Sequence, residues 1–296
     1  MQLGLRAALL LSGLHWKRWE RSTKEPRQAQ TQRLLQLVRK NQHTRFGREH
    51  GFRSIKNIDD YRKQVPIGDY ERFRPYINLA KLGERAVLTD EPILMFTLTS
   101  GSTGEPKLIP VTESSRASHA KITRLWYAKA INAHPGCARG KIFGLVGSAV
   151  EGHTAGGIPY GAASGLIYQS SPAWVRRAHA LPYEIAEIKD FQAKYYAAMR
   201  LALDQNVTFL GTPNPSTILR LVEIADRFGA DIIRDIHDGS LSDRFDITNS
   251  LRSAISARLA PNPARAQKLE QLIKRQQQFR PIDYWPQLQL IGCWKG

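Results

Sequence analysis

Short apolar runs of strand length alternate with stretches of helical period over most of the chain beyond about residue 80. The apolar runs cover residues 93–96, 142–146, 207–210 and 288–294. The earlier residues carry helical patterns instead. This order predicts an α/β fold in which a helical lead-in (residues 1–85) precedes a mostly parallel sheet with flanking helices (residues 86–296).

A helix is expected directly after the first apolar run and the loop that follows it. Thr112 is suited to cap this helix, and Glu113 falls in its first turn. Its expected apolar face consists of Ile122, Leu125, Trp126 and Ala130. The loop before it should therefore lie between a strand end and a helix start, where open α/β sheets bind ligands.

A second strand–loop–helix unit follows at residues 207–229. Its helix is expected to be capped by Ser216 or Thr217 and to end near Gly229. The loop of residues 211–215 either lines the same cleft as the first loop or forms a stiff turn through its two prolines.

The chain has 296 residues and is 42% hydrophobic, enough to bury a sizeable core. No repeat, low-complexity tract or linker divides it. Two cysteines cannot form a disulfide framework and suit a reducing compartment, so we expect a cytoplasmic protein. The sequence has no H-E-x-x-H pair, and residues 235–238 (DIHD) lack calcium-loop spacing. We therefore expect no metal site built by the protein and a solvated turn at 235–238.

The net charge of +17 is concentrated near the N-terminus. Residues 1–56 contain thirteen Lys and Arg against three acidic residues, a balance of +10. A solvated face, peripheral contact with an anionic membrane or lipid substrate, and nucleic acid are the alternatives. The absence of a nucleic-acid module or interleaved aromatic residues disfavours the last. Residues 3–14 are apolar but too short to span a bilayer and lack a cleavage site, which predicts an amphipathic helix.

The candidate chemistry lies in residues 97–110, which read TLTSGSTGEPKLIP. Gly101 and Gly104 remove Cβ atoms, so that successive backbone N–H groups can converge on an anion. Thr99, Ser100, Ser102 and Thr103 add hydroxyl donors, and Lys107 adds a fixed positive charge. The P-loop pattern G-x-x-x-x-G-K-[ST] does not fit, because Pro106 precedes Lys107 and Leu108 follows it. The pattern therefore predicts a phosphate-binding loop of another kind.

The string S-G-S-T-G-E-P-K resembles the nucleotide-phosphate loop of adenylate-forming enzymes. Four further stretches are similar to one branch, the Gretchen Hagen acyl-acid amido synthetases, also called the auxin-responsive promoter family. They are residues 41–52 (NQHTRFGREHGF), 65–77 (VPIGDYERFRPYI), 157–165 (GIPYGAASG) and 214–221 (NPSTILRL). The resemblance implies an ATP-dependent ligase that uses Mg²⁺, forms an acyl-adenylate from a carboxylic acid, and transfers the acyl group to an amine or amino acid.

The same resemblance implies roles for single residues. Ser102, Thr103 and Lys107 would contact the β- and γ-phosphates and act in catalysis, whereas Thr99, Ser100, Gly101 and Gly104 would complete the nucleotide-binding loop. No Mg²⁺ ligand can be named. The polar loop of residues 148–157 is expected to be either an ordinary surface loop or a border of the acyl pocket, because it follows a strand that should lie beside the phosphate loop.

Residues 288–294 resemble the strand that leads to the adenine and ribose motifs of that family. Neither motif follows in this sequence, nor does a small C-terminal lid domain. We therefore expect an incomplete N-terminal adenylation domain that is inactive by itself. A thioester-forming ligase and a non-catalytic fragment that binds a ligand or a partner remain alternatives.

Overall fold

The computed structural model describes residues 16–17, 19–99, 106–276 and 279–294. The helix expected at residues 3–14 lies outside them. The chain divides into two compact units, one formed by Met1–Ala128 and Ala149–Ala163 and the other by Lys129–Ser148 and Ser164–Gly296. The helix α6 (Glu113–Ala133) carries the chain from the first unit into the second.

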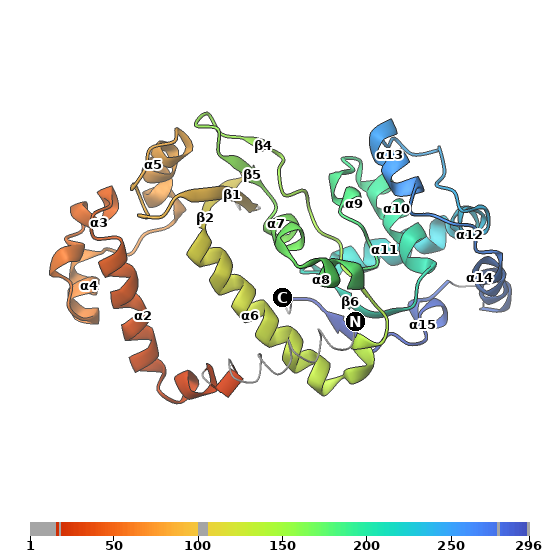
Figure 1. Ribbon diagram of the computed structural model, residues 1–296, viewed down its shortest axis with the longest axis horizontal. Coiled ribbons are helices and arrows are strands. Elements are labelled where there is room, and N and C mark those ends of the chain that lie inside the picture. Colours follow the sequence, from red (N-terminus) through yellow and green to blue (C-terminus); the bar gives the residue numbers. More distant parts are fainter. Residues whose placement is uncertain (1–15, 18, 100–105, 277–278, 295–296) are drawn as a thin grey trace. The chain divides into compact units, whose positions relative to one another are not determined.

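Helices open the first unit, as the pattern predicts (Figure 1). They are α2 (Pro26–Lys40), α3 (Arg45–Glu49), the 3-10 helix η1 (Phe52–Ser54), α4 (Ile58–Gln64) and α5 (Tyr70–Lys81). The side chains of Thr44, Asn57 and Asp69 accept hydrogen bonds from N–H groups in the first turns of α3, α4 and α5. These caps satisfy groups that a helix start would otherwise leave unpaired, and so fix where the three helices begin.

A four-stranded sheet completes the first unit. Its strands are β1 (Ile93–Thr99), β2 (Lys107–Thr112), β4 (Gly152–His153) and β5 (Pro159–Gly161), in the order β2-β1-β5-β4. β1 pairs antiparallel with β2 and parallel with β5, and β4 pairs antiparallel with β5. Phe96 of β1 is fully buried and packs with Ile77 and Ala80 of α5. The helical layer is thereby anchored on the sheet.

The helix α6 begins directly after β2. The Thr112 hydroxyl accepts a hydrogen bond from the Ser115 N–H (3.3 Å), so the predicted cap is confirmed. The predicted apolar face is wrong in part: Leu125 is buried, whereas Ile122 and Trp126 are 64% and 48% exposed. Several apolar rows lie close together on this helix, and helical period alone does not decide which row is covered.

The second unit contains the remaining helices and a separate three-stranded sheet. Its helices are η2 (Pro135–Ala138), α7 (Ala163–Ser170), α8 (Ala173–Ala178), α9 (Glu184–Glu187), α10 (Phe191–Leu203), α11 (Pro215–Arg227), α12 (Gly229–Asp238), α13 (Asn249–Ser256), α14 (Pro263–Gln276) and α15 (Pro281–Tyr284). Its strands β3 (Lys141–Phe143), β6 (Val207–Gly211) and β7 (Leu290–Gly292) are parallel, in the order β3-β6-β7. The α/β class is thus correct, but the single, mostly parallel sheet is corrected to one mixed and one parallel sheet.

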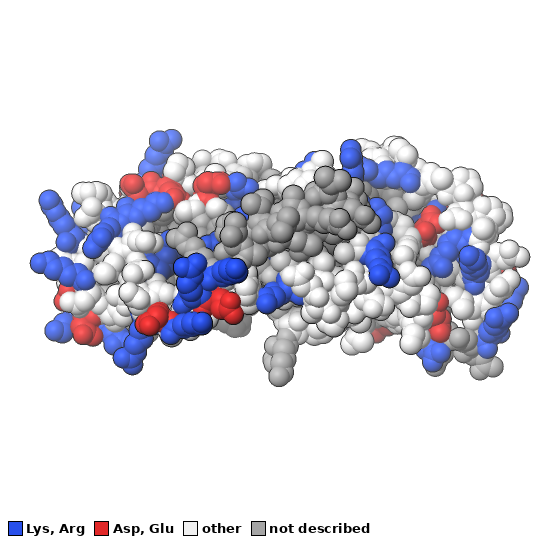
Figure 2. All heavy atoms as spheres, turned by 60° about the horizontal axis from the view of Figure 1, so that its bottom comes forward, with Lys and Arg blue, Asp and Glu red and all other residues white. Residues whose placement is uncertain are grey.

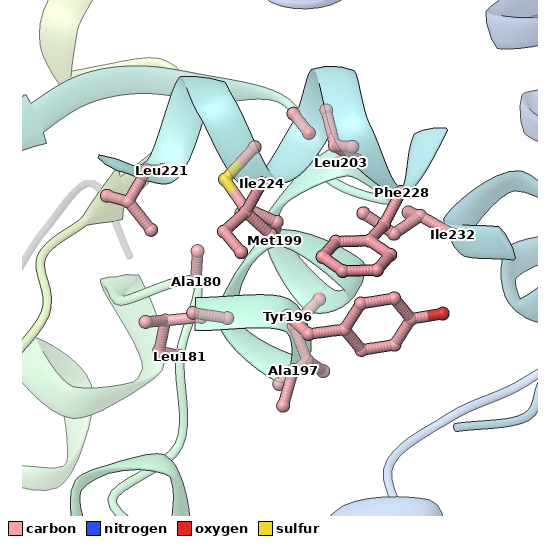
Figure 3. Packing of buried hydrophobic residues seen from close by; sticks show 14 of the residues in the cluster. Ala180, Leu181, Tyr196, Ala197, Met199, Leu203, Leu221, Ile224, Phe228 and Ile232 are labelled. Atoms are coloured by element: carbon pink, nitrogen blue, oxygen red, sulfur yellow. The ribbon is translucent and has the colours of Figure 1, made fainter. Parts of the chain in front are cut away.

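The core of the second unit is built around α10. Nine of its thirteen residues are buried, among them Tyr196 and Met199, which are both fully covered. Figure 3 shows Tyr196 beside Phe228, with Met199 and Ile224 between this pair and Leu221. The expected strand at residues 288–294 is present as β7, but Ile291 is 53% exposed, so this strand is less buried than its apolar sequence predicts.

A polar network closes one side of this core. Asp235 is 2% exposed and accepts hydrogen bonds from the Tyr196 hydroxyl (2.7 Å), the Ser242 N–H (2.7 Å) and the Ser240 hydroxyl (3.1 Å). The solvated turn expected at residues 235–238 is therefore wrong, since these residues end α12 with Asp235 on its inner face. A buried carboxylate is tolerated here because three donors surround it.

A second carboxylate ties three parts of the first unit together. Glu91 binds the ammonium of Lys40 at the end of α2 and accepts hydrogen bonds from the N–H (3.1 Å) and hydroxyl (2.8 Å) of Ser114 in α6. The Lys40 hydrogen bond, helped by the Thr112 and Ser114 donors, lowers the pKa of Glu91 to about 2.

The pairing of Tyr196 with Asp235 predicts a stability change. Tyr196→Phe removes one donor from a buried carboxylate and should lower the free energy of unfolding by about 1–3 kcal/mol. Urea denaturation measures the change. Tyr195→Phe on the same helix is the control, because no hydrogen bond of the Tyr195 hydroxyl is found within the described residues; it should shift stability by less than about 0.5 kcal/mol. Equal effects of the two variants would contradict the role of the Asp235 network.

The lowered pKa of Glu91 predicts a pH dependence. Because the folded-state pKa lies below the unfolded value, the contribution of Glu91 is present above about pH 4.5 and is lost as the pH falls toward 2. Between pH 5 and 3 the unmodified protein should therefore lose about 1–2 kcal/mol more stability than Glu91→Gln does. Urea titrations at each pH test this, with Asp90→Asn as the control. Parallel pH curves for Glu91→Gln and the unmodified protein would rule the contribution out.

Candidate functional site

The candidate phosphate loop joins two paired antiparallel strands. Thr99, the last residue of β1, lies opposite Lys107, the first residue of β2. Ser100, Gly101, Ser102, Thr103 and Gly104 lie outside the described residues. The structure thus places two of the predicted site residues, Thr99 and Lys107, side by side at the mouth of the loop.

This arrangement corrects the expected position of the loop between a strand and a helix. The helix α6 begins at Glu113, at the far end of β2 from the loop. A six-residue strand is about 20 Å long. The N–H group of Ser114 in the first turn of α6 binds Glu91. Donors to an anion at the loop therefore have to come from the hairpin itself and from elements beside it, rather than from the start of α6.

The start of α5 lies against the first residues of β2, directly after the loop. Asp69 caps α5 by accepting hydrogen bonds from the N–H groups of Glu71 (3.1 Å) and Arg72 (3.4 Å), which places Tyr70 at the first helical position. The Tyr70 hydroxyl accepts a hydrogen bond from the Leu108 N–H (3.0 Å). The Lys107 ammonium nitrogen lies 5.5 Å from the centre of the Tyr70 ring, within the range of a cation–π contact.

Further charges surround the same ring. The Arg74 guanidinium carbon lies 5.3 Å from the Tyr70 ring centre, and Arg74 forms two hydrogen bonds with the Glu71 carboxylate (2.6 and 2.7 Å). The hydrogen bonds from Arg74 lower the pKa of Glu71, and the positive charge of Lys107 contributes to the shift. Lys107, Arg74 and Glu71 together carry an excess of one positive charge among the described residues at neutral pH, and such an excess favours an anion nearby.

The other edge of β1 pairs with β5, which belongs to the GIPYGAASG stretch. Phe96 lies opposite Tyr160, and Thr97 lies opposite Gly161. In the turn before β5, the Gly156 N–H donates to the Lys81 carbonyl (2.8 Å), and a Cβ at Gly156 would collide with the backbone of Gly83. Only glycine fits this close approach between the turn and the end of α5.

The strand expected beside the phosphate loop is therefore corrected. The apolar run at residues 142–146 contributes to β3, which pairs with β6 in the second unit, whereas β5 is the neighbour of β1. Of the polar loop that follows, Gly152 and His153 form β4, which pairs with β5. The Ser148 hydroxyl donates to Glu187 (2.9 Å) within the second unit. That the loop of residues 148–157 borders the acyl pocket stays a prediction.

The second strand–loop–helix unit is present, but its cap differs. The helix α11 begins at Pro215, and the Asn214 side chain accepts a hydrogen bond from the Ser216 N–H (3.0 Å). Ser216 and Thr217 are thus inside the helix. Pro215 takes the first helical position, where its missing N–H costs nothing, so Asn214 before it is the residue free to cap. A ligand contact of this loop stays a prediction.

Sequence reasoning missed Tyr70 and Glu91. Tyr70 stands inside the quoted stretch of residues 65–77, directly after a capping Asp, but nothing local indicates a partner 38 residues away at Leu108.

Within the described residues, no group of three or more His, Cys, Asp or Glu side chains could hold a metal ion.

Comparison with known proteins identifies a family for this chain. Residues 15–296 match the family described as the GH3 family N-terminal domain. The chain is 26% identical to indole-3-acetic acid-amido synthetase GH3.5 of Arabidopsis thaliana over 261 residues, which is 85% of this chain and 42% of the relative. It is also 26% identical to the probable indole-3-acetic acid-amido synthetase GH3.11 of Oryza sativa subsp. japonica, over 94% of this chain and 46% of the relative.

The fold is similar to that of a solved acyl acid amido synthetase, GH3.15. That structure superposes with a TM-score of 0.75 at 24% identity, covering 87% of this chain and 47% of the other. The chain spans about half the length of the relatives it matches. Because the family match extends over nearly the whole chain, the chain belongs to the GH3 family and forms that family's N-terminal domain.

Proposed function

We propose that the protein containing this chain is an ATP-dependent ligase that forms an acyl-adenylate from a carboxylic acid and transfers the acyl group to an amine or amino acid. The observation that carries the proposal is the hairpin of β1 and β2. Its loop has the composition of a phosphate-binding loop, and Lys107 at its mouth has no ion-pair partner within the described residues. The named activity of the GH3 relatives supports the same reaction class.

In the first step, a carboxylate oxygen of the acid attacks the α-phosphorus of ATP. The bond from that phosphorus to the oxygen bridging to the β-phosphate breaks, and pyrophosphate leaves. Negative charge shifts onto the leaving phosphates in this step. Ser102, Thr103 and Lys107 would stabilise it through hydrogen bonds and a positive charge, while Gly101 and Gly104 admit the phosphate close to the backbone and Thr99 and Ser100 complete the loop.

In the second step, the amine nitrogen attacks the activated carbonyl carbon. The bond to AMP breaks, and the amine loses a proton. Mg²⁺ would enter with ATP, held largely by phosphate oxygens and water, as is usual for this ion. A thioester ligase would share the first step and differ only in using a thiol as the acceptor, and a non-catalytic ligand-binding protein would perform neither step.

We also propose that residues 16–40 contact an anionic membrane surface. Six exposed cations in this segment form no ion pair within the described residues: Lys17, Arg21, Lys24, Arg27, Arg33 and Arg39. Trp16 and Trp19 lie with ring centres 4.9 Å apart, and Trp19 is 44% exposed. Tryptophan beside basic residues is typical of helices at membrane interfaces. Figure 2 shows a face on which Lys and Arg are widespread. None of the described helices has the length and apolar character needed to cross a bilayer.

The proposed reaction is tested by removing the charge at the loop. Lys107→Ala should lower ATP–pyrophosphate exchange by about 100-fold or more at saturating ATP, because it removes a contact to the developing charge. Lys63→Ala, which removes an exposed lysine from α4, is the matched control and should leave exchange unchanged. Product analysis with amino acids or coenzyme A as acceptors then separates an amide from a thioester ligase. These measurements use the complete protein that contains this chain. Full exchange in its Lys107→Ala variant would remove Lys107 from the mechanism, and absence of exchange in the unmodified complete protein would refute adenylation.

The membrane proposal predicts binding to vesicles that contain phosphatidylserine and weaker binding to vesicles of phosphatidylcholine alone. Changing Arg21, Lys24 and Arg27 to Gln should reduce cosedimentation with the anionic vesicles by about 10-fold or more, at roughly 1 kcal/mol per basic residue. Changing Lys268, Lys274 and Arg275 to Gln removes the same charge from the exposed side of α14 and is the control. Equal losses from both triple variants would mean that the effect comes from net charge and not from this segment.

A further inference from the structure

Tyr70 acts on two consecutive residues of β2 through different parts of its side chain. Its hydroxyl accepts a hydrogen bond from the Leu108 N–H (3.0 Å) and lies 3.4 Å from the Leu108 carbonyl oxygen, to which it can donate. Its ring lies near the ammonium of the preceding residue, Lys107, at 5.5 Å from the ring centre. One side chain therefore touches both the backbone at the start of β2 and the charged group proposed to bind phosphate.

The contact with Leu108 provides hydrogen-bond partners for backbone groups on the outer edge of β2. β2 is the outer strand of its sheet and pairs only with β1 there. Because both the N–H and the C=O of Leu108 reach Tyr70, they point away from β1, and a single hydroxyl satisfies them. An unpaired strand edge next to a loop frays easily. The hydroxyl thus holds the strand in place directly after Lys107.

Tyr70 is itself held firmly. It begins α5, whose start is capped by Asp69, and it is partly buried against the small core that contains Ile77 and Phe96. A ring fixed in this way offers a stationary face to the ammonium of Lys107. A lysine chain that is otherwise free would have to be ordered at each turnover, with a loss of conformational entropy.

The neighbouring charges leave Lys107 available to an anion. Glu71 lies close enough to feel the charge of Lys107, but its carboxylate is occupied by two hydrogen bonds from Arg74. Lys107 has no ion pair within the described residues and rests against an uncharged ring instead. No salt bridge within the described residues therefore has to break before its ammonium can act on a phosphate group.

We propose that Tyr70 is a positioning residue for Lys107: its hydroxyl fixes the first residues of β2, and its ring holds the lysine ammonium at the mouth of the loop of residues 100–106. Tyr70 acts through Lys107 and does not itself touch the substrate. This inference rests on the proposed function for its catalytic consequence, but the contact between Tyr70 and Lys107 can be measured without it.

A double-mutant cycle tests the catalytic consequence in the complete protein. Tyr70→Leu should lower the maximal rate of ATP–pyrophosphate exchange about 10-fold when Lys107 is present, but less than about 2-fold in the Lys107→Ala background, because coupled residues are not additive. Tyr70→Phe keeps the ring and the packing and should recover part of the rate. A merely structural role would give the same factor in both backgrounds, and equal factors would overturn the proposal.

Chemical labelling measures the contact independently of adenylation. Acetylation of Lys107 by an N-hydroxysuccinimide ester, followed by peptide mass spectrometry and expressed relative to Lys63, should be about 2- to 5-fold faster in Tyr70→Leu, since loss of the ring removes the contact that covers the ammonium group. An unchanged ratio would overturn the proposal even if exchange were lost. If the unmodified protein shows no exchange while the ratio rises, the proposed function fails and the contact stands. Circular dichroism of each variant confirms that it is folded.

Discussion

The pairing of β1 on both edges is the constraint on which the candidate site depends. β2 pairs with one edge and β5 with the other, and Phe96 in the middle of β1 is fully buried against α5. Pairing on both sides holds the middle of β1 at Phe96 and Thr97, and the register with β2 sets Lys107 opposite Thr99 at the end of the strand. The loop between these two residues therefore leaves from a rigid base, as a site that orients phosphate groups requires.

Three parts of the first unit converge on this hairpin. The start of α5 supplies Tyr70 and the Glu71–Arg74 pair beside Lys107, while Glu91 links the end of α2 to the start of α6 at the opposite end of β2. The two ends of β2 therefore differ in their charged neighbours. At the loop, Lys107 remains without an acidic partner within the described residues; at the helix start, the N–H of Ser114 is matched by a carboxylate. The proposed binding of phosphate at the loop relies on this difference.

The second unit contains a helix, α10, that carries polar groups into its core. Nine of the thirteen residues of α10 are buried, so the polar groups among them are cut off from water and need partners within the protein. The Tyr196 hydroxyl donates to Asp235. The fully buried Arg200 donates to Asp204 and to the Ser240 carbonyl, while its Nη2 has no hydrogen-bond partner among the described residues. These bonds join α10 to α12 and to the residues that follow α12. The unit is therefore held by directional polar contacts as well as by its apolar core.

The sequence by itself determined the local features: the early helices, the strands at the apolar runs, the cap at Thr112, and the glycine- and hydroxyl-rich loop ending at Lys107. Each depends on neighbours a few residues apart, which periodicity and residue type report directly. The tertiary structure alone decided that β2 intervenes between loop and helix, that β5 rather than β3 pairs with β1, that Asp235 is buried, and that Tyr70 meets Lys107 and Leu108. Strand partners and side-chain contacts across dozens of residues follow from how the elements pack together. Apolar period indicates the type of an element but not which element covers it, nor, in α6, which of its apolar residues are buried.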